Sequence, residues 1–317
     1  MLFRPIEAMT STANGDEMSG ICEGRVCVIT GAGRGIGREY ALMLAGQGAK
    51  IVVNDLGGDM TGEGEDATPA QQVVAEIEAM GGEAVANGAN VADFDAAGEM
   101  IQQAIDHFGR LDVLVNNAGI LRDRMLVNMA EGEWDAVIAV HLKGTFGPTR
   151  HAAAHWRELV KAGETVDARI INTTSPSGIY GNVGQTNYGA AKAGIAAFTV
   201  ISAMELERYG VTCNAIAPAA ITRMTEDLGM GQLDEETKAS MAPHWIAPIV
   251  TWLASPESKD VTGRVFQVSG RELAVAEGWH KGPAVEPTDD PTEIGAKVAE
   301  LMADARPNAD MFGNDKK

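Results

Sequence analysis

The chain has 317 residues, of which 45% are apolar, and its 44 acidic and 25 basic residues give a formal net charge of -19. This length can bury the core of one large α/β domain, while the negative charge disfavours contact with the phosphate backbone of nucleic acids. No apolar run reaches the roughly 20 residues that span a bilayer, and the N-terminus lacks the pattern of a secretory signal. We therefore expect no nucleic acid and no membrane as partners.

The cysteines and the two chain ends add further expectations. Cys22, Cys27 and Cys213 do not suggest a disulfide framework or a metal site, so we expect no metal and a reducing, cytoplasmic location. By composition, residues 1–20 should form a disordered tail. From Gly270 onward the chain is rich in Pro, Gly and acidic residues and loses strand signals. Residues 271–317 should therefore form a C-terminal extension with one helix over 291–305.

Short apolar runs alternate with segments of helical periodicity between residues 21 and 270. In chain order, the predicted strands span 25–30, 50–54, 83–86, 111–116, 169–174, 211–217 and 264–268. Predicted helices between them include 35–47, 71–80, 96–108 and 188–209. Continuous apolar strands separated by helices predict a doubly wound parallel sheet covered on both faces. The expected fold is a single Rossmann-like α/β domain.

The stretch TGAGRGIG, residues 30–37, follows the first predicted strand directly. In a doubly wound sheet this turn presents backbone N–H groups and a helix N-terminus to a phosphate, and glycines allow close approach. The spacing matches T-G-x-x-x-G-x-G rather than G-x-G-x-x-G or a Walker A loop. A tight turn that binds nothing is the alternative. The residues expected to hold a dinucleotide here are Gly31, Gly33, Arg34, Gly35, Ile36 and Gly37.

Two further turns are expected at the same edge of the sheet. Asp55 ends the second predicted strand, where a carboxylate accepts hydrogen bonds from the adenosine ribose of NAD and repels the 2′-phosphate of NADP. An ordinary aspartate of a turn is the alternative. The fourth predicted strand ends in NNAG, residues 116–119, and Asn117, Ala118 and Gly119 should border the nucleotide. These turns predict a cofactor site for NAD.

The fifth predicted strand leads into NTTSPSGIYGNVGQTNYGAAK, which contains Ser175, Tyr188 and Lys192. Tyr188 and Lys192 are four residues apart, so they share one face of a helix. A phenol with a pKa near 10 is a weak base at neutral pH, but an adjacent ammonium favours its phenolate. Ser175 can hydrogen-bond a substrate oxygen on which charge develops. A Tyr-x-x-x-Lys pair alone is common, whereas this combination predicts acid/base chemistry.

Together these motifs resemble the short-chain dehydrogenase/reductase family over roughly residues 21–270. A narrower similarity is carried by VVNDLGGD, VVNNAGILRDRM, VHLKGTF, SGIYGNVGQTNYGAAK and IAPAAITRMT. These stretches resemble the (3R)-hydroxyacyl-CoA dehydrogenase unit of peroxisomal multifunctional enzyme type 2, also described as a type four 17β-hydroxysteroid dehydrogenase, and its stand-alone bacterial relatives. The resemblance implies NAD-dependent interconversion of 3-hydroxyacyl-CoA and 3-ketoacyl-CoA in fatty-acid or sterol side-chain breakdown.

The resemblance also implies roles for single residues. Tyr188 would be the acid/base, Lys192 would bind the nicotinamide ribose and lower the tyrosine pKa, and Ser175 would orient the reacting oxygen. His141 stands where many members carry an asparagine that helps to hold a water next to the lysine, and a packing role is its alternative. The remaining expected cofactor contacts are Asn90, Val91, Pro218, Ile221 and Thr222.

Some features leave alternatives open. Arg34 occupies a position where many NADP-preferring members carry arginine, but it could instead pair with Asp55 or lie over the adenine. Arg122 and Arg124 could contact CoA phosphates or form local salt bridges. The segment 223–245 lies where the family has its substrate lid.

Two other functions remain in competition with the acyl-CoA enzyme. One is a hydroxysteroid or other apolar-alcohol dehydrogenase that needs no CoA, and the other is a noncatalytic NAD(H)-binding sensor. By resemblance, the long helices before and after the fifth strand commonly form dimer surfaces. A homodimer or homotetramer is therefore expected.

Overall fold

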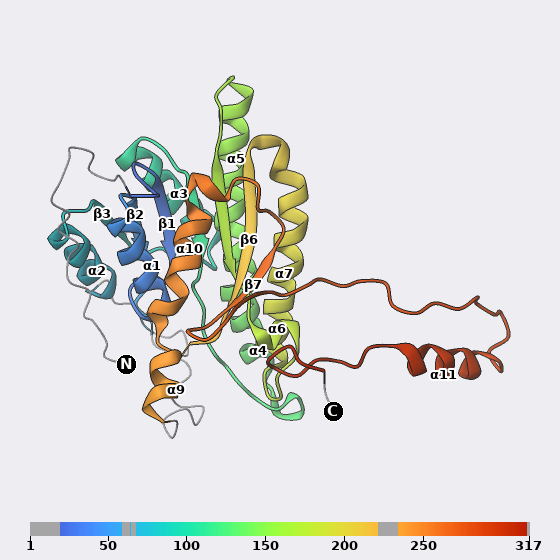
Figure 1. Ribbon diagram of the computed structural model, residues 1–317. Helices are drawn as coiled ribbons and strands as arrows, with labels where there is room; N and C mark the ends of the chain where they lie inside the picture. Colours follow the sequence, from blue (N-terminus) through green and yellow to red (C-terminus); the bar gives the residue numbers. More distant parts are fainter. Residues whose placement is uncertain (1–19, 59–63, 65–67, 221–233, 316–317) are drawn as a thin grey trace, which may run out of the picture.

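The computed structural model describes residues 20–58, 64, 68–220 and 234–315. An eight-stranded sheet has the order β3-β2-β1-β4-β5-β6-β7-β8, with parallel neighbours except for the antiparallel pair β7 and β8. The predicted doubly wound, Rossmann-like fold is confirmed (Figure 1). The strands are β1 Val26–Thr30, β2 Lys50–Asn54, β3 Ala84–Asn87, β4 Val113–Asn116, β5 Ala168–Thr173, β6 Val211–Pro218, β7 Val265–Val268 and β8 Leu273–Val275.

Helices form a layer on each face of this sheet. One layer consists of α1 Gly35–Gly46, α2 Thr68–Ala79 and α10 Ala247–Ala254. The other consists of α3 Phe94–Phe108, α5 Gly144–Lys161 and α7 Thr186–Leu206. Shorter helices are α4 Glu131–Ile138, the π-helix η2 Ala139–Lys143, α6 Pro176–Ile179, α9 Glu235–Ser240 and α11 Ile294–Asp304, with 3-10 turns η1 Leu126–Asn128, η3 Glu207–Tyr209, η5 Pro243–Ile246 and η6 Pro256–Ser258.

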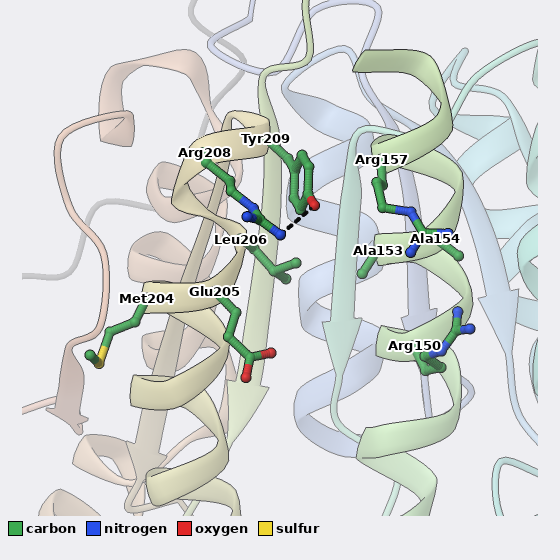
Figure 2. A pocket seen from close by; sticks show the side chains of 9 residues that line it. All are labelled: Arg150, Ala153, Ala154, Arg157, Met204, Glu205, Leu206, Arg208 and Tyr209. Carbon is green, nitrogen blue, oxygen red and sulfur yellow. Dashed lines mark hydrogen bonds between the residues drawn. The ribbon is translucent and has the colours of Figure 1, made fainter. Parts of the chain in front are cut away.

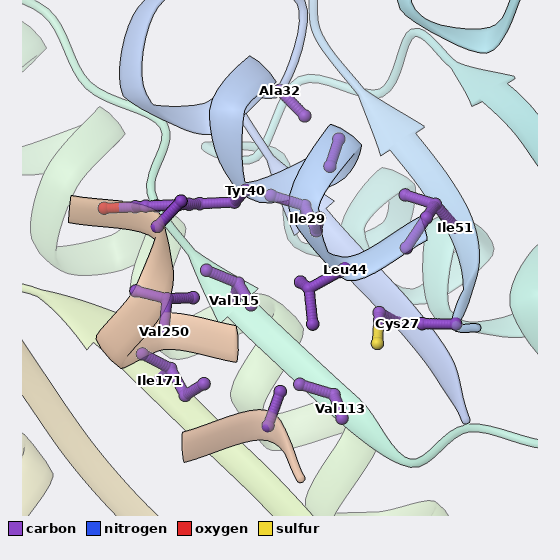
Figure 3. Close-up of a cluster of buried hydrophobic side chains, with 14 of the residues drawn as sticks. Cys27, Ile29, Ala32, Tyr40, Leu44, Ile51, Val113, Val115, Ile171 and Val250 are labelled. Carbon is purple, nitrogen blue, oxygen red and sulfur yellow. The ribbon is translucent and has the colours of Figure 1, made fainter. Parts of the chain in front are cut away.

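The central strands are mostly apolar because both of their faces are covered. In β1, Cys27 and Ile29 pack in the layer of α1, α2 and α10, whereas Val26 and Val28 pack in the layer of α3, α5 and α7. Successive side chains of a strand point to opposite faces, so a strand buried on both sides favours a nearly continuous apolar run. Figure 3 shows part of the first layer, with Leu44 of α1 among the strand side chains.

The predicted and observed elements differ mainly at their ends. Helix α3 begins two residues earlier than expected because Asp93 caps it, accepting hydrogen bonds from Asp95 N at 2.9 Å and Ala96 N at 3.0 Å. Apolar periodicity does not register such a polar cap. Strand β8 was not expected at all, and it extends the sheet beyond residue 270. With only three residues at the sheet edge, it carries too short a pattern to stand out.

The C-terminal extension leaves the body after β8 as a long arm that carries α11 (Figure 1). This helix spans Ile294–Asp304, within the predicted range 291–305, and none of its side chains is buried. The arm returns at its end, where Gly313 lies beside the hydroxyl of Tyr180. The predicted N-terminal tail lies outside the described residues except for Gly20.

One described helical stretch, Thr186–Tyr209, is long and apolar enough to cross a membrane by length and composition. It contains α7, which packs against the sheet and buries polar side chains such as Asn187, Lys192 and Thr199 on its inner side. Core helices of folded domains commonly satisfy the same two criteria. The inner face of α7 therefore belongs to the fold, and its buried lysine leads to the candidate site.

Candidate active site

The strand order reverses between β1 and β4, and in doubly wound sheets ligands bind at the carboxyl ends of the strands at such a point. Thr30 joins the two loops that leave these strands. Its Oγ1 accepts hydrogen bonds from Asn117 N at 2.9 Å and Ala118 N at 3.1 Å. The Asn117 side chain donates to the carbonyl oxygens of Thr30 and Gly31, both at 3.0 Å. The glycine loop and the NNAG turn are therefore bonded directly to each other.

Three glycines of the loop, Gly31, Gly33 and Gly37, have no space for a side chain. A Cβ atom on Gly37 would lie 2.2 Å from the carbonyl oxygen of Gly31, and one on Gly31 would lie 2.8 Å from Ala118 Cα. Helix α1 starts at Gly35 and has no acidic residue in its first turn and no side-chain cap. Free N–H groups and an uncompensated helix dipole suit an anion, so the loop fits the pyrophosphate of a dinucleotide.

Asp55 follows β2 at the same edge. Its Oδ2 accepts a hydrogen bond from Gly33 N at 2.8 Å, and its Oδ1 accepts one from Gly57 N at 2.7 Å. These bonds hold the carboxylate against the glycine loop. Arg34 Nη1 instead donates to the carbonyl oxygen of Gly58 at 3.4 Å, and the salt bridges of the described residues include none between Arg34 and Asp55.

Ser175, Tyr188 and Lys192 come together where β5 ends. Ser175 caps α6, and its Oγ accepts a hydrogen bond from Ser177 N at 3.1 Å. Tyr188 and Lys192 lie one helical turn apart on α7, with Lys192 Nζ 5.5 Å from the centre of the Tyr188 ring. Lys192 is buried, and its Nζ donates to the carbonyl oxygen of Thr173 at 2.6 Å. The three predicted residues therefore share one site.

Burial controls the protonation of this site. It lowers the pKa of Lys192 to about 7. It raises the pKa of Tyr188 to about 12, although a side-chain hydrogen bond with Ser175 acts in the opposite direction. The role of Lys192 in lowering the pKa of Tyr188, which the family resemblance implies, stays a prediction.

His141 lies in the π-helix η2, a local irregularity that often marks functional positions. Its Nε2 is 3.1 Å from Ile120 N and 2.8 Å from Ile120 O, while its Nδ1 is buried without a described partner. The ring meets Tyr188 edge to face, with 5.1 Å between ring centres. Burial, with a further effect of Lys192, lowers the pKa of His141 to about 3, so the imidazole is neutral.

The His141 ring also explains why position 119, the last of the NNAG turn, is a glycine. A Cβ atom on Gly119 would lie 2.3 Å from His141 Cε1, which is closer than real carbon contacts. The two positions are 22 residues apart in the chain, so nothing in the sequence connects them. The His141 ring therefore leaves no space for a side chain at position 119.

The remaining predicted contacts lie farther from the reacting groups or outside the described residues. Asn90 is exposed, and its Oδ1 accepts a hydrogen bond from Ala92 N at 2.9 Å, whereas Val91 is buried. Pro218 ends β6. Ile221 and Thr222 lie outside the described residues, as do residues 223–233 of the predicted lid segment.

One arginine of the ILRDRM stretch forms the local contact that was the alternative to CoA binding. Arg124 pairs with Glu133 at 2.8 Å. Between the two arginines, Asp123 accepts a hydrogen bond from Gln185 Nε2 at 2.7 Å, a contact that the sequence reasoning missed. The only sequence signal for it is the position of Gln185, three residues before Tyr188.

A separate hollow lies between α5 and α7, at the opposite end of α7 from Tyr188 (Figure 2). Figure 2 shows Arg150 and Arg157 on α5 and Arg208 turned toward Tyr209, to whose hydroxyl it donates a hydrogen bond of 2.7 Å. This hollow contains none of the predicted site residues. Among the residues that the structure describes, no group of three His, Cys, Asp or Glu side chains could hold a metal ion.

Known proteins are similar to this chain over most of its length. Hydroxyacyl-CoA dehydrogenase ChsB1 of Mycobacterium tuberculosis is 42% identical over 315 residues, covering 96% of this chain and 95% of that protein. Peroxisomal multifunctional enzyme type 2 of Mus musculus is 46% identical over 246 residues, covering 78% of this chain but 32% of the mouse enzyme. The crystal structure of a short chain dehydrogenase from Mycobacterium avium has a TM-score of 0.82 and 54% identity, covering 92% of this chain and 98% of that one.

The family profile agrees with these relatives and with the geometry at the sheet edge. The profile of the short chain dehydrogenases matches residues 25–232, which include the glycine loop and the Ser175, Tyr188 and Lys192 cluster. The fold, the relatives and the profile lead to one conclusion. The chain belongs to the short chain dehydrogenase family and is an oxidoreductase.

Proposed function

We propose that this protein is an NAD-dependent dehydrogenase that interconverts a 3-hydroxyacyl-CoA and the corresponding 3-ketoacyl-CoA. The observation that carries the proposal is the grouping of Ser175, Tyr188 and Lys192 at the carboxyl edge of the sheet, the edge from which the glycine loop also leaves. The acyl-CoA substrate is supported by the names of the relatives, a hydroxyacyl-CoA dehydrogenase among them. Fatty-acid or sterol side-chain breakdown is the class of process that such a reaction would serve.

Each residue of the cluster has a separate role in the proposed reaction. Tyr188, protonated at neutral pH because burial raises its pKa to about 12, donates its proton to the carbonyl oxygen during reduction and recovers it during oxidation. Ser175 hydrogen-bonds the same oxygen and stabilises the charge that develops on it. Lys192 uses one donor on Thr173 O, and a protonated amine has two more for the nicotinamide ribose. Bound NAD would supply the hydride acceptor.

His141 has a positioning role in this proposal. Its neutral ring packs against Tyr188 and contacts the backbone of Ile120, so it fixes the tyrosine and the loop after β4 in one arrangement. Its Nδ1, which has no partner among the described residues, would bond a water near Lys192. The imidazole would thereby serve where many family members use asparagine.

The choice of NAD over NADP rests on Asp55. Its two oxygens are held by Gly33 N and Gly57 N at the end of β2, where a 2′-phosphate would meet a carboxylate of like charge. The other cofactor contacts belong to the same proposal, including those of Asn90, Val91, Pro218, Ile221 and Thr222. Thermal-shift titration should show tighter binding of NAD than of NADP. Tighter binding of NADP would make Arg34 the determining residue.

A substrate panel tests the reaction itself. The wild-type protein with NAD should oxidise 3-hydroxybutyryl-CoA with a higher kcat/KM than free 3-hydroxybutyrate or a hydroxysteroid. A higher kcat/KM for the hydroxysteroid would favour the apolar-alcohol dehydrogenase. Binding of NAD without turnover of any alcohol would favour the noncatalytic sensor.

Self-association is also part of the proposal. Phe146 of α5 and Val200, Ile201 and Met204 of α7 are exposed large apolar side chains on the two helices that border the hollow of Figure 2. Exposed apolar side chains favour contact with another chain, and a homodimer or homotetramer would cover them. Light scattering should therefore give a multiple of the chain mass. A cytoplasmic location is consistent with three buried cysteines that form no disulfide bond with one another.

A further inference from the structure

The C-terminal arm comes back to the body in a compact turn, residues 309–315, which we call the C-terminal turn. The first and last residues of this turn form an antiparallel bridge. Asp310 closes it, because its N–H donates to Asn314 O at 2.7 Å and its Oδ1 accepts from Phe312 N at 2.8 Å and Asn314 N at 2.9 Å. The turn therefore has a defined shape of its own.

Gly313 of the C-terminal turn rests on Tyr180 (Figure 1). Its φ is +85°, a conformation that favours glycine. A Cβ atom at this position would lie 2.8 Å from Tyr180 Oη and 3.1 Å from Tyr180 Cζ. The same hydroxyl donates a hydrogen bond of 2.7 Å to Gln267 Oε1 on β7. Both β7 and the C-terminal turn therefore contact the hydroxyl end of Tyr180.

Helix α6 connects this tyrosine to the proposed active site. Ser175 caps its N-terminus, and Tyr180 caps its C-terminus. The N–H groups of residues 177–179 donate to Ser175 at 3.1, 2.9 and 3.2 Å, and Tyr180 N donates to Pro176 O at 2.8 Å. Since proline has no N–H, every N–H group from the start of α6 to Tyr180 is bonded within this short segment. A displacement of Tyr180 is therefore transmitted to Ser175.

The other contacts of α6 leave its C-terminal end to Tyr180. A Cβ atom on Gly178 would lie 2.6 Å from Lys192 Cβ, so α6 cannot come closer to α7. Ile179 packs against apolar side chains of β6 and β7. The middle of α6 is thus held by α7 and by the sheet, and its end is held by what contacts Tyr180.

We propose that the C-terminal turn is a positioning element of the active site, which holds Ser175 in place through Tyr180 and α6. The inference rests on the role of Ser175 in the proposed function. No side chain of α11 is buried, so this part of the arm adds little to the core, and the contact at Tyr180 gives the arm a use. A catalytic group misplaced by about 1 Å can cost roughly 100-fold in rate.

Two variants remove the contact, and each has a matched control. Gly313→Ala places a methyl group against Tyr180, so either the ring or the turn must move. Its control is Gly163→Ala, because Gly163 has a φ of +90° and a Cβ atom there would meet nothing within 4 Å. Asp310→Ala removes the carboxylate that closes the C-terminal turn. Its control is Asp290→Ala, because Asp290 closes a similar turn in an exposed part of the arm.

The first measurement is kcat with 3-hydroxybutyryl-CoA and NAD, expressed per NADH-binding site so that unfolded protein does not count. Gly313→Ala and Asp310→Ala should lower kcat about 5- to 20-fold and leave the Kd of NADH within about twofold. In a Ser175→Ala background the same two changes should lower kcat by less than about twofold further, because the group that the turn positions is already missing. The controls should stay within about twofold of wild type in kcat and Kd.

The second measurement needs no turnover. Hydrogen exchange of a peptide that covers residues 176–183 reports the opening of α6, whose N–H groups are all bonded. Exchange in this peptide should be at least about threefold faster in Gly313→Ala and Asp310→Ala than in wild type, and unchanged in both controls.

Two results would overturn the positioning role. An equal fall of kcat with and without Ser175 would show that the turn acts on another group, and unchanged kcat and exchange in both variants would show that the turn does not hold α6. Failure of the proposed function is distinguishable, because it appears in the wild type as turnover of a hydroxysteroid alone or of no alcohol. Unchanged exchange at α6 would then overturn the contact with the turn independently.

Discussion

Two buried cations, Arg169 and Lys192, lie at opposite ends of β5 and differ in how their donors are used. Arg169 is 1% exposed and Lys192 is 3% exposed. Lys192 donates to one described acceptor, Thr173 O. Arg169 pairs with Asp167 and donates to the carbonyl oxygens of Ala168, Ser255 and Pro256 and to the hydroxyl of Ser258.

The difference separates a structural cation from one that is left for a ligand. The donors of Arg169 are directed at groups of the fold, and those bonds connect β5 to the turn after α10. A buried cation with one bond retains donors that only another molecule can use. The amino edge of the sheet therefore contributes stability, and in the proposed function the carboxyl edge contributes chemistry.

The largest expected effect is that of Lys192→Met. Turnover should fall about 100- to 10,000-fold because the variant lacks the ribose-binding donor and its charge. The free energy of unfolding at pH 7 should stay the same or rise, since an apolar group replaces a poorly solvated cation. Initial rates and urea denaturation measure the two quantities. Turnover within threefold of wild type would place Lys192 with the structural cations.

Arg169→Met should show the opposite pattern. Its buried acceptors lose their donor, so the free energy of unfolding should fall by about 3 kcal/mol. Turnover per folded molecule should remain near that of wild type. Arg157→Met is the matched control, because this partly exposed arginine pairs only with its neighbour Glu158 among the described residues, and its removal should leave stability nearly unchanged. If Arg169→Met lost turnover without a loss of stability, Arg169 would not be a structural cation.

A pair of residues at the carboxyl edge should show a structural coupling. Gly119→Ala should lower the free energy of unfolding by about 1 to 3 kcal/mol, because its Cβ meets the His141 ring at 2.3 Å. In a His141→Ala background the same change should cost at least about 1 kcal/mol less. Denaturation of the four proteins of this cycle measures the coupling. Equal costs in both backgrounds would show that the ring is not the obstacle.

A smaller effect is the change of the free energy of unfolding with pH, which we expect to depend on Lys192 and not on Arg169. Burial lowers the pKa of Lys192 in the folded protein to about 7, below its unfolded value, so the unfolded chain binds more protons above pH 7. The stability penalty of Lys192 is complete below the folded pKa and is relieved as the pH rises toward the unfolded one. Wild type should gain about 1 to 2 kcal/mol relative to Lys192→Met between pH 7 and pH 8.5. Arg169→Met should retain the wild-type gain, and its loss there would contradict this account.

Much of the fold follows from local patterns. Seven strands were expected within two residues of their observed bounds because strands buried on both faces are mostly apolar. Strand β8 was missed since it has only three residues, two of them exposed, and so short an apolar run does not stand out. The cap of α3 at Asp93 was missed because it depends on polar groups outside the apolar periodicity.

The site was predictable where spacing along one element decides contact. Tyr188 and Lys192 lie four residues apart on one helix, and their proximity was expected. The partners of His141 and Asp123 were not, because Gly119 and Gln185 reach them from other elements. Nor does any residue type indicate that Lys192 bonds a backbone carbonyl, since every residue carries one.

The most direct test of the central claim is Tyr188→Phe, which removes only the hydroxyl from the carboxyl-edge cluster. NADH binding, followed by its fluorescence, should remain within about threefold of wild type, because the cofactor loop and Lys192 are unchanged. Oxidation of 3-hydroxybutyryl-CoA with NAD should fall at least about 100-fold. Turnover at the wild-type rate with intact NADH binding would contradict the assignment of the reaction to this edge of the sheet.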